Sequence, residues 1–196
     1  MPEVVIIAGP NGAGKTLLSS EFLKKDFHEY DYINADNIAF ELNPQKPEKE
    51  NIAAGRRALR ELKLLYEQRK DFIFETTLSG KGHTKLLKIC RDKGYTVTLV
   101  FLWLPSADMA VKRVQNRVKQ GGHSIPEKDI RRRFYRGLNN LLRIYLPLCH
   151  RGIILDSTKP IGRQPRIAEK IGNDEKLIIQ NEDLWQFILK EVGHGR

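Results

Sequence analysis

The segment GPNGAGKT, close to the start of the chain, has residue types and a spacing suited to binding phosphate. It fits the pattern G-x-x-x-x-G-K-[ST], in which backbone N–H groups bind phosphate oxygens, the lysine reaches the β- and γ-phosphates, and the hydroxyl holds Mg²⁺. We therefore predict a site for ATP and Mg²⁺. The residues predicted to form it are Gly9, Pro10, Asn11, Gly12, Ala13, Gly14, Lys15 and Thr16, with Lys15 also catalytic and Thr16 the metal ligand.

A carboxylate follows the second strand-like run, in YINADN. Asp36 lies just beyond the carboxyl end of that run, where open α/β sheets bind ligands, and it could accept the proton of an attacking hydroxyl. The alternative is structural, with Asn34 or Asp36 capping the helix that follows. We predict that Asp36 is catalytic and also contacts the acceptor substrate.

The third strand-like run ends in FETTLSG, which places acidic and hydroxyl side chains beside the same crevice. We predict that Glu75, Thr77 and Ser79 bind the acceptor, while the alternative is that Thr-Thr is simply a good strand sequence. The run lacks the Asp-Glu ending that a motor or transporter ATPase would carry there. That difference argues against a mechanochemical role.

Arginines lie on both sides of a Gly121–Gly122 pair. Arg113 and Arg117 are four residues apart and share a helix face, whereas Arg133 follows the glycines. Guanidinium groups match the charge of a phosphoryl group in transfer, so we predict a lid over about residues 113–133. Arg117 and Arg133 are predicted to be catalytic, and Arg113 to bind the nucleotide. The alternative for each is a solvated helix face.

The elements that must position these residues alternate between strand-like and helix-like runs, which is the pattern of a parallel sheet covered by helices. The expected strands are 4–9, 30–35, 71–76, 95–104 and 152–157, and the expected helices include 15–25, 84–93, 107–120 and 126–146. Residues 166–181 predict a β-hairpin with a turn at Gly172–Asn173–Asp174, and 182–192 predict a last helix. We thus expect an α/β, three-layer P-loop fold with about five parallel strands, in a single domain over residues 1–196.

Composition narrows the choice of partners. With 34 Lys and Arg against 24 Asp and Glu, the net charge of +10 indicates a polyanionic ligand. Aromatic residues do not alternate with the basic ones, so nucleotide phosphates are favoured over nucleic acid. The longest apolar run is too short to cross a membrane, and Cys90 and Cys149 lack metal spacing, which predicts a cytoplasmic protein with free thiols.

Five segments together resemble the zeta-toxin family of P-loop kinases over roughly residues 4–156: GPNGAGKT, INADNIA, FETTLSG, GYTVTLVFLWL and RVQNRVKQGGHSIPEKDIRRRF. The best-known members of that family phosphorylate a sugar hydroxyl of UDP-N-acetylglucosamine and are blocked by an antitoxin protein. The resemblance implies roles for individual residues: phosphate binding for Lys15 and Arg117, catalysis for Asp36, and substrate contact for Glu75 and Thr77.

One position departs from the family pattern. Where the better-known toxins have a second arginine before xTP, this chain has His123 before SIP, so Arg133 or a neighbouring arginine is expected to take over that task. His123 is predicted to lie against the substrate, and the alternative is that it only makes local hydrogen bonds.

We therefore predict an ATP-dependent kinase whose small-molecule acceptor is a UDP-sugar, with an antitoxin as a potential partner. Two other functions stay open. One is a kinase for another nucleotide, a cofactor or a nucleic-acid end, and the other is a nucleotide-dependent switch that acts through partners. Asp36 separates them, because a switch needs no base beside an acceptor pocket.

Overall fold

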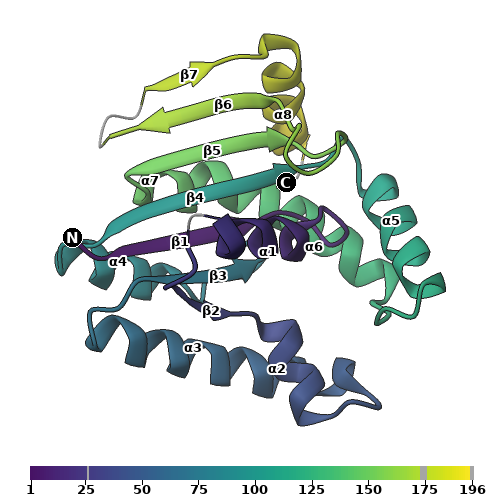
Figure 1. Ribbon diagram of the computed structural model, residues 1–196. Coiled ribbons are helices and arrows are strands. Elements are labelled where there is room, and N and C mark those ends of the chain that lie inside the picture. Colours follow the sequence, from purple (N-terminus) through teal and green to yellow (C-terminus); the bar gives the residue numbers. More distant parts are fainter. Residues whose placement is uncertain (26, 173–175, 195–196) are drawn as a thin grey trace.

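The structure is a computed structural model that describes residues 1–25, 27–172 and 176–194. The described residues form one seven-stranded sheet in the order β2-β3-β1-β4-β5-β6-β7 (Figure 1). The strands are β1 (Glu3–Ala8), β2 (Asp31–Ile33), β3 (Phe72–Thr76), β4 (Thr96–Trp103), β5 (Arg151–Asp156), β6 (Arg166–Ile171) and β7 (Leu177–Ile179). The first five pair in parallel, which confirms the predicted fold class.

Helices connect and cover these strands, as the alternating pattern predicted. They are α1 (Lys15–Lys25), α2 (Ala35–Leu42), α3 (Asn51–Glu67), α4 (Thr84–Asp92), α5 (Ala107–Lys119), α6 (Glu127–Asn140), α7 (Leu146–Leu148) and α8 (Glu182–His194). A 3₁₀ turn, η1 (Pro47–Glu50), precedes α3, and a π-helical turn, η2 (Leu141–Tyr145), joins α6 to α7. The expected single helix over 126–146 is therefore interrupted by a π turn near its end.

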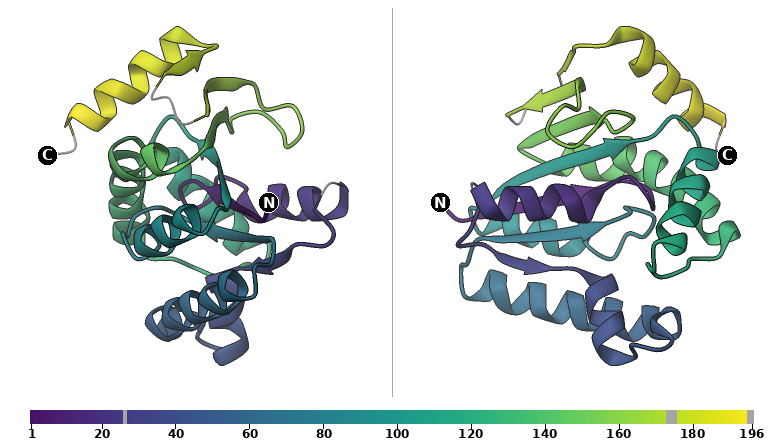
Figure 2. Two further views of the ribbon diagram at one scale, coloured as in Figure 1. Left: turned by 90° about the vertical axis from the view of Figure 1, so that its left-hand side faces the viewer. Right: turned by 45° about the vertical axis from the view of Figure 1, so that its right-hand side comes forward.

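Successive side chains along each buried strand point to opposite faces of the sheet, so each face has a hydrophobic core of its own. In β1, Val4 and Ile6 pack with α4, α7 and α8, whereas Val5 and Ile7 pack with α1 and α5. The left view of Figure 2, along the strands, shows α1 on one side of the sheet and α4, α7 and α8 on the other. Because β1 is buried on both faces, it reads as a continuous apolar run and not as an alternating one.

The C-terminal hairpin extends the same sheet. β6 pairs antiparallel with β5, and β7 pairs antiparallel with β6. Glu169 of β6 is buried between two arginines, accepting from Arg151 and Arg166 at 2.8 Å each. The hairpin itself is confirmed, but its predicted turn at Gly172–Asn173–Asp174 lies largely outside the described residues.

The strand order places a ligand-binding crevice at β1. β1 lies between β3 and β4 in the sheet; the connection that leaves β1 leads to β2 on one side, and the connection that leaves β3 leads past β1 to β4 on the other. Such a reversal of direction between neighbouring strands is where open α/β sheets bind ligands. The carboxyl ends of β1 to β5 point to one edge, where α2 and α5 also lie (Figure 1).

Within the described residues, no helix combines the length and apolar character needed to cross a membrane.

Candidate active site

The glycine-rich loop joins β1 to α1 and has the backbone geometry of a phosphate-binding loop. Gly9, Gly12 and Gly14 all have positive φ, at 145°, 77° and 92°. At Gly12 a Cβ atom would lie 2.9 Å from the Cβ of Arg113, so only glycine lets α5 pack this closely on the loop. Helix α1 begins at Lys15, and its first N–H groups and dipole add positive potential at the loop.

Lys15 lies close to both the acidic and the basic side chains of the site. Its Nζ donates to the carbonyl oxygens of Gly9 and Pro10, each at 3.1 Å. Burial lowers the pKa of Lys15, the carboxylates of Glu75 and Asp36 oppose that shift, and Arg117 and Arg133 add to it. Asp36, Arg117 and Arg133, which separate motifs predicted to be catalytic, therefore all lie close enough to shift the pKa of the Lys15 ammonium group, as does Glu75.

Thr16 lies beside a carboxylate. Its Oγ1 donates to Glu75 Oε2 at 3.1 Å, and the other Glu75 oxygen accepts a hydrogen bond from the Tyr32 hydroxyl. Asn34 Nδ2 donates to the same hydroxyl at 2.9 Å, and burial together with Glu75 raises the pKa of Tyr32. Glu75, predicted only as an acceptor-side residue, therefore also lies next to the hydroxyl predicted to hold Mg²⁺.

Asn34, and not Asp36, caps helix α2. Asn34 has an extended backbone with φ −132°, and its Oδ1 accepts from the N–H of Asp36 at 2.8 Å. The capping alternative considered for Asp36 is therefore wrong, because its carboxylate is not used by its own helix. The side chain of Asp36 is about half exposed and its Oδ2 lies 3.7 Å from His123 Nε2.

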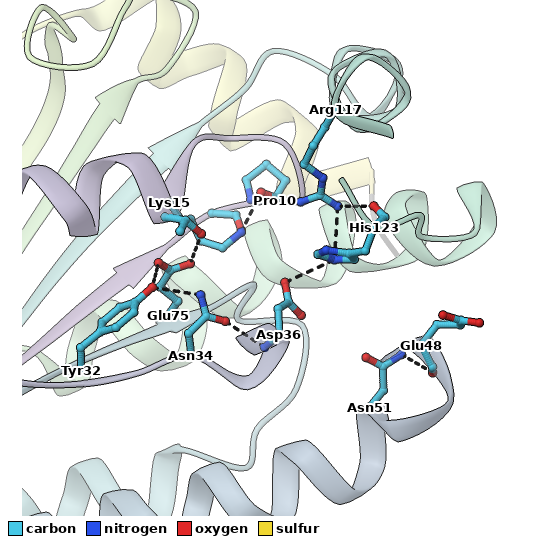
Figure 3. Close-up of polar contacts among 12 residues, drawn as sticks. Pro10, Lys15, Tyr32, Asn34, Asp36, Glu48, Asn51, Glu75, Arg117 and His123 are labelled. Carbon is cyan, nitrogen blue, oxygen red and sulfur yellow. Dashed lines mark hydrogen bonds and ion pairs between the residues drawn. The ribbon is translucent and has the colours of Figure 1, made fainter. Parts of the chain in front are cut away.

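Arg117 reaches from α5 toward the same place (Figure 3). Its Nη2 donates to the carbonyl oxygen of His123 at 3.0 Å and lies 3.3 Å from His123 Nε2. Burial lowers the pKa of both side chains, and for His123 the charge of Arg117 lowers it further. His123 therefore lies between Arg117 and Asp36.

The three consecutive arginines of α6 have different surroundings. Arg131 pairs with Asp108 at 2.6 Å and with Glu127 at 2.8 Å, and Arg132 pairs with Asp129 at 2.8 Å. Arg133 lines both cavities of the site, and Arg132 lines the larger one. Arg113 on α5 approaches the glycine loop, with its Nη1 3.5 Å from Gly12 O.

A cavity of about 700 Å³ opens between the glycine loop, α2, α3 and the segment after β3. This volume lies within the range of small-molecule sites. Lys15, Asp36 and Arg133 line one part of it, and Glu75, Thr77 and Ser79 line another. Thr77 and Ser79 share a hydrogen bond of 2.9 Å between their hydroxyls. A smaller cavity of about 40 Å³ adjoins it, lined by Asp36, His123 and Arg133 among others.

Several residues of the site were not predicted from the sequence. Tyr32, which donates to Glu75, is one, although its position near the end of a strand, two residues before Asn34, was a usable signal. Helix α3 contributes a whole wall, and His83 stacks on Phe74 with ring centroids 4.8 Å apart. The lining residues outside the predicted site residues are Ile33, Asn34, Ala35, Asn51, Ile52, Gly55, Arg56, Ala58, Leu59, Leu62, Phe74, Thr76, Gly80, Gly82, His83 and Arg132.

The residues present fit ATP and Mg²⁺. Two polar side-chain atoms at the site, Asn11 Oδ1 and Arg117 Nε, are buried without a hydrogen-bond partner among the described residues. Such atoms are expected where a polar ligand completes the hydrogen bonding. Thr16 and Glu75 carry oxygen atoms of the kind that Mg²⁺ prefers and would hold the ion together with substrate phosphates and water.

Comparison with known proteins places this geometry in a family context. The family model described as "Zeta toxin" matches residues 1–146. An uncharacterized protein of Haemophilus influenzae is 32% identical over 132 residues, which is 67% of this chain and 92% of that protein.

Solved structures share the fold at low sequence identity. A chain of the AvrRxo1-ORF1:AvrRxo1-ORF2 complex superimposes with a TM-score of 0.73 at 16% identity over 96% of this chain. The present chain spans only 63% of that chain's length, and the same complex has also been solved with ATP. A structure from the PezAT chromosomal toxin-antitoxin system of Streptococcus pneumoniae gives a TM-score of 0.62 at 15% identity, covering 100% of this chain and 87% of that one. A gluconokinase from Sinorhizobium meliloti 1021 gives 0.54 at 11% identity, over 98% and 91%.

Proposed function

This chain belongs to the zeta toxin family, and on that premise we propose that it is a kinase that transfers the γ-phosphate of ATP to a hydroxyl group of a small molecule. The observation that carries the proposal is the position of Asp36. It lines the same 700 Å³ cavity as Lys15 of the glycine-rich loop, and it is free of the capping role that Asn34 fills. A carboxylate next to both a phosphate-binding lysine and an acceptor-sized cavity suits a general base.

Each side chain then has a role in transfer. ATP would supply the phosphoryl group, held by the loop from Gly9 to Thr16, and Mg²⁺ would bind at Thr16 with Glu75 nearby. Asp36 would accept the proton of the acceptor hydroxyl as the hydroxyl oxygen bonds to the γ-phosphorus, and the bond from that phosphorus to the β,γ-bridging oxygen would break, so that ADP leaves. Arg117 and Arg133 stabilise the charge on the transferring group, which is strongest in the transition state.

The acceptor site is the larger cavity. Thr77 and Ser79 present hydroxyls there, and Arg56 and Arg132 add positive charge. The volume and mixed polarity suit a nucleotide-sized molecule, and the family resemblance makes UDP-N-acetylglucosamine the first acceptor to test. We propose that residues 113–133 act as the lid of a single kinase domain.

Two alternative functions, a kinase for nucleic-acid ends and a nucleotide-dependent switch, would give different experimental results. The net charge of +10 would also suit a nucleic-acid end as acceptor, in which case binding of single strands should persist at physiological salt. A nucleotide-dependent switch would hydrolyse ATP slowly and tolerate loss of Asp36. The position of Asp36 in the cavity favours the kinase over the switch.

The test is a screen of sugar nucleotides, other nucleotides and oligonucleotides with γ-labelled ATP. We expect transfer to a sugar nucleotide, loss of transfer in Lys15→Ala, and normal transfer in Lys24→Ala, which removes an exposed lysine from the end of the same helix. Transfer by folded Lys15→Ala near the wild-type rate would contradict the assignment of the loop. Labelling of oligonucleotides alone would favour the nucleic-acid alternative.

We also propose that an antitoxin protein restrains this kinase. Support comes from the family and from the structural likeness to a chain of the PezAT toxin-antitoxin system. If transfer is toxic, induced expression of the wild type should arrest growth and Lys15→Ala should not. Equal growth of both strains at equal protein levels would argue against toxicity.

A further inference from the structure

One face of α6 and η2 runs from the proposed lid to the acceptor cavity. Arg133, Gly137 and Asn140 are four and three residues apart, a spacing that keeps them on one side of an α-helix. Arg133 lines the cavity, and the two residues after it on this face contact the segment after β3. The same helix therefore carries a proposed catalytic arginine and touches the loop that presents Thr77 and Ser79.

That loop, Thr77–Gly80, has a strained backbone at its centre. Leu78 is fully buried and has φ 55°, a left-handed conformation that is costly for a residue with a Cβ atom. Its N–H donates to Oγ1 of Thr76, the last residue of β3, at 3.1 Å. Such strain persists only where surrounding contacts hold the backbone in place.

Three contacts from α6 and η2 hold it. Asn140 Nδ2 donates to Leu78 O at 2.7 Å, and the Tyr145 hydroxyl donates to Gly80 O at 2.7 Å. At Gly137 a Cβ atom would lie 2.3 Å from Thr77 O, so the helix backbone rests directly on the loop. Both donors are buried, with 6% of Asn140 and none of Tyr145 exposed.

The π turn explains how both donors reach one loop. Tyr145 follows Asn140 by five residues, and in a continuous α-helix it would point about 140° away from it. In a π turn the hydrogen bonds run from i to i+5, so five residues close about one turn and Tyr145 returns to the face of Asn140. The irregularity in the helix thus serves the loop that lines the cavity.

We propose that Gly137, Asn140 and Tyr145 are positioning residues that hold the acceptor loop in register with Arg133 of the lid. The inference rests on the proposed kinase function, because it assigns the loop to acceptor binding. Loosening these contacts should displace the hydroxyls of Thr77 and Ser79 while leaving the glycine-rich loop intact. The expected signature is a weaker use of the acceptor at unchanged affinity for ATP.

The test compares Tyr145→Phe and Gly137→Ala with Tyr135→Phe, a control at an exposed tyrosine of α6. Tyr145→Phe removes the hydroxyl that holds the Gly80 carbonyl oxygen, so kcat/KM for UDP-N-acetylglucosamine should fall by roughly 2- to 10-fold, the size expected for one hydrogen bond. Gly137→Ala raises the helix propensity of α6, but its Cβ atom would push Thr77 away. A similar fall in kcat/KM for the acceptor, without a lower melting temperature, would show that the contact positions the loop and is not needed for folding. The KM for ATP should stay within about twofold in both variants.

Hydrogen exchange of the peptide spanning residues 77–83 gives a readout that needs no acceptor. Both variants should exchange faster there than the wild type and Tyr135→Phe, with no change in α1. Unchanged exchange, or equal losses in the kinetics of ATP and acceptor, would overturn the positioning role. If the wild type transfers no phosphate to any acceptor, the proposed kinase function fails. Faster exchange of the loop in the two variants would still show that Gly137 and Tyr145 hold the loop in place.

Discussion

Asp36 and His123 face each other at the edge of the site, with 3.7 Å between Asp36 Oδ2 and His123 Nε2. The same ring nitrogen lies 3.3 Å from Arg117 Nη2. Without a proton, Nε2 can accept a hydrogen bond from Arg117, and with a proton it can only donate, toward Asp36. The protonation state of His123 therefore decides whether its Nε2 accepts a hydrogen bond from Arg117 or pairs with the carboxylate of Asp36, the proposed base.

This relationship predicts an acid limb in the pH profile of transfer. Burial, Arg117 and Arg133 lower the pKa of His123, while Asp36 and Glu48 raise it, and the net shift is downward, so the ring is neutral at pH 7. As the pH falls through that lowered pKa, His123 becomes a cation that repels Arg117 and pairs with Asp36. We expect kcat to fall over this range in the wild type, and the fall to move to lower pH in His123→Gln. Superimposable profiles of the two proteins would show that His123 protonation does not govern transfer.

Asp36 and Asn34 offer a matched pair for separating chemistry from capping. Asp36→Asn keeps the size of the side chain but removes its basicity, so transfer should fall by roughly 100-fold or more while ATP still binds. Asn34→Ala removes the cap of α2 and should lower the free energy of unfolding by about 1 kcal/mol. Urea unfolding and transfer assays on both variants check this. A stability loss in Asp36→Asn equal to that in Asn34→Ala would contradict the base assignment.

Much of this site could be predicted because its signals are local. The glycine loop, the strand before it and α1 lie within about two dozen residues, and the positive φ angles of Gly9 and Gly12 account for the residue type at those positions. Asp36 and Glu75 each follow a strand directly, and parallel strands bring such positions to one edge. The choice between Asn34 and Asp36 as cap needed the structure, because either residue type can cap a helix.

What the sequence did not reveal depends on tertiary packing. No local pattern says that α3 forms a wall of the cavity, because its lining residues Asn51, Gly55 and Arg56 are ordinary for a solvated helix. The π turn is equally hidden, since its residues continue the helical pattern of α6 and only the structure shows that Tyr145 of this turn contacts the loop after β3. Likewise, the antiparallel pairing of β6 onto β5 extends a sheet whose edge no short motif defines.

His83 predicts a pH dependence of stability. It stacks on Phe74, and burial lowers its pKa to about 4. The unfolded chain, with an ordinary histidine pKa of about 6.5, binds the proton first, so stability is full above about pH 6.5 and is lost as the pH falls toward 4. The contribution of His83 should be about 2 to 3 kcal/mol across that window.

Urea unfolding at pH 7 and pH 4.5 tests this dependence. His83→Gln should be less stable than the wild type at pH 7, because stacking is lost, but should lose less on acidification. His28→Gln is the control, since the side chain of His28 is largely exposed. If wild type and His83→Gln lose equal stability between the two pH values, His83 is not held neutral by burial.

The proposed lid predicts unequal roles for the arginines of α5 and α6. Arg117 and Arg133 lie near enough to Lys15 to shift its pKa, whereas Arg131 is engaged by Asp108 and Glu127. Groups that stabilise charge in the transition state affect kcat more than ground-state binding. Arg117→Ala and Arg133→Ala should therefore each lower kcat by roughly 10- to 1,000-fold, with a smaller effect on ATP affinity.

The control for the lid arginines is Arg131→Ala, which breaks two ion pairs of an exposed side chain and should leave kcat within about twofold. Steady-state kinetics and a separate measurement of ATP binding distinguish the outcomes. Equal, small effects of all three substitutions would mean that this surface is a solvated helix face. The second cation beside Lys15 would then have to come from Arg113, whose Nη1 already lies 3.5 Å from the carbonyl oxygen of Gly12. In that event the glycine loop and Asp36 would keep their proposed roles, and Arg113→Ala would show the loss in kcat expected here for Arg117 and Arg133.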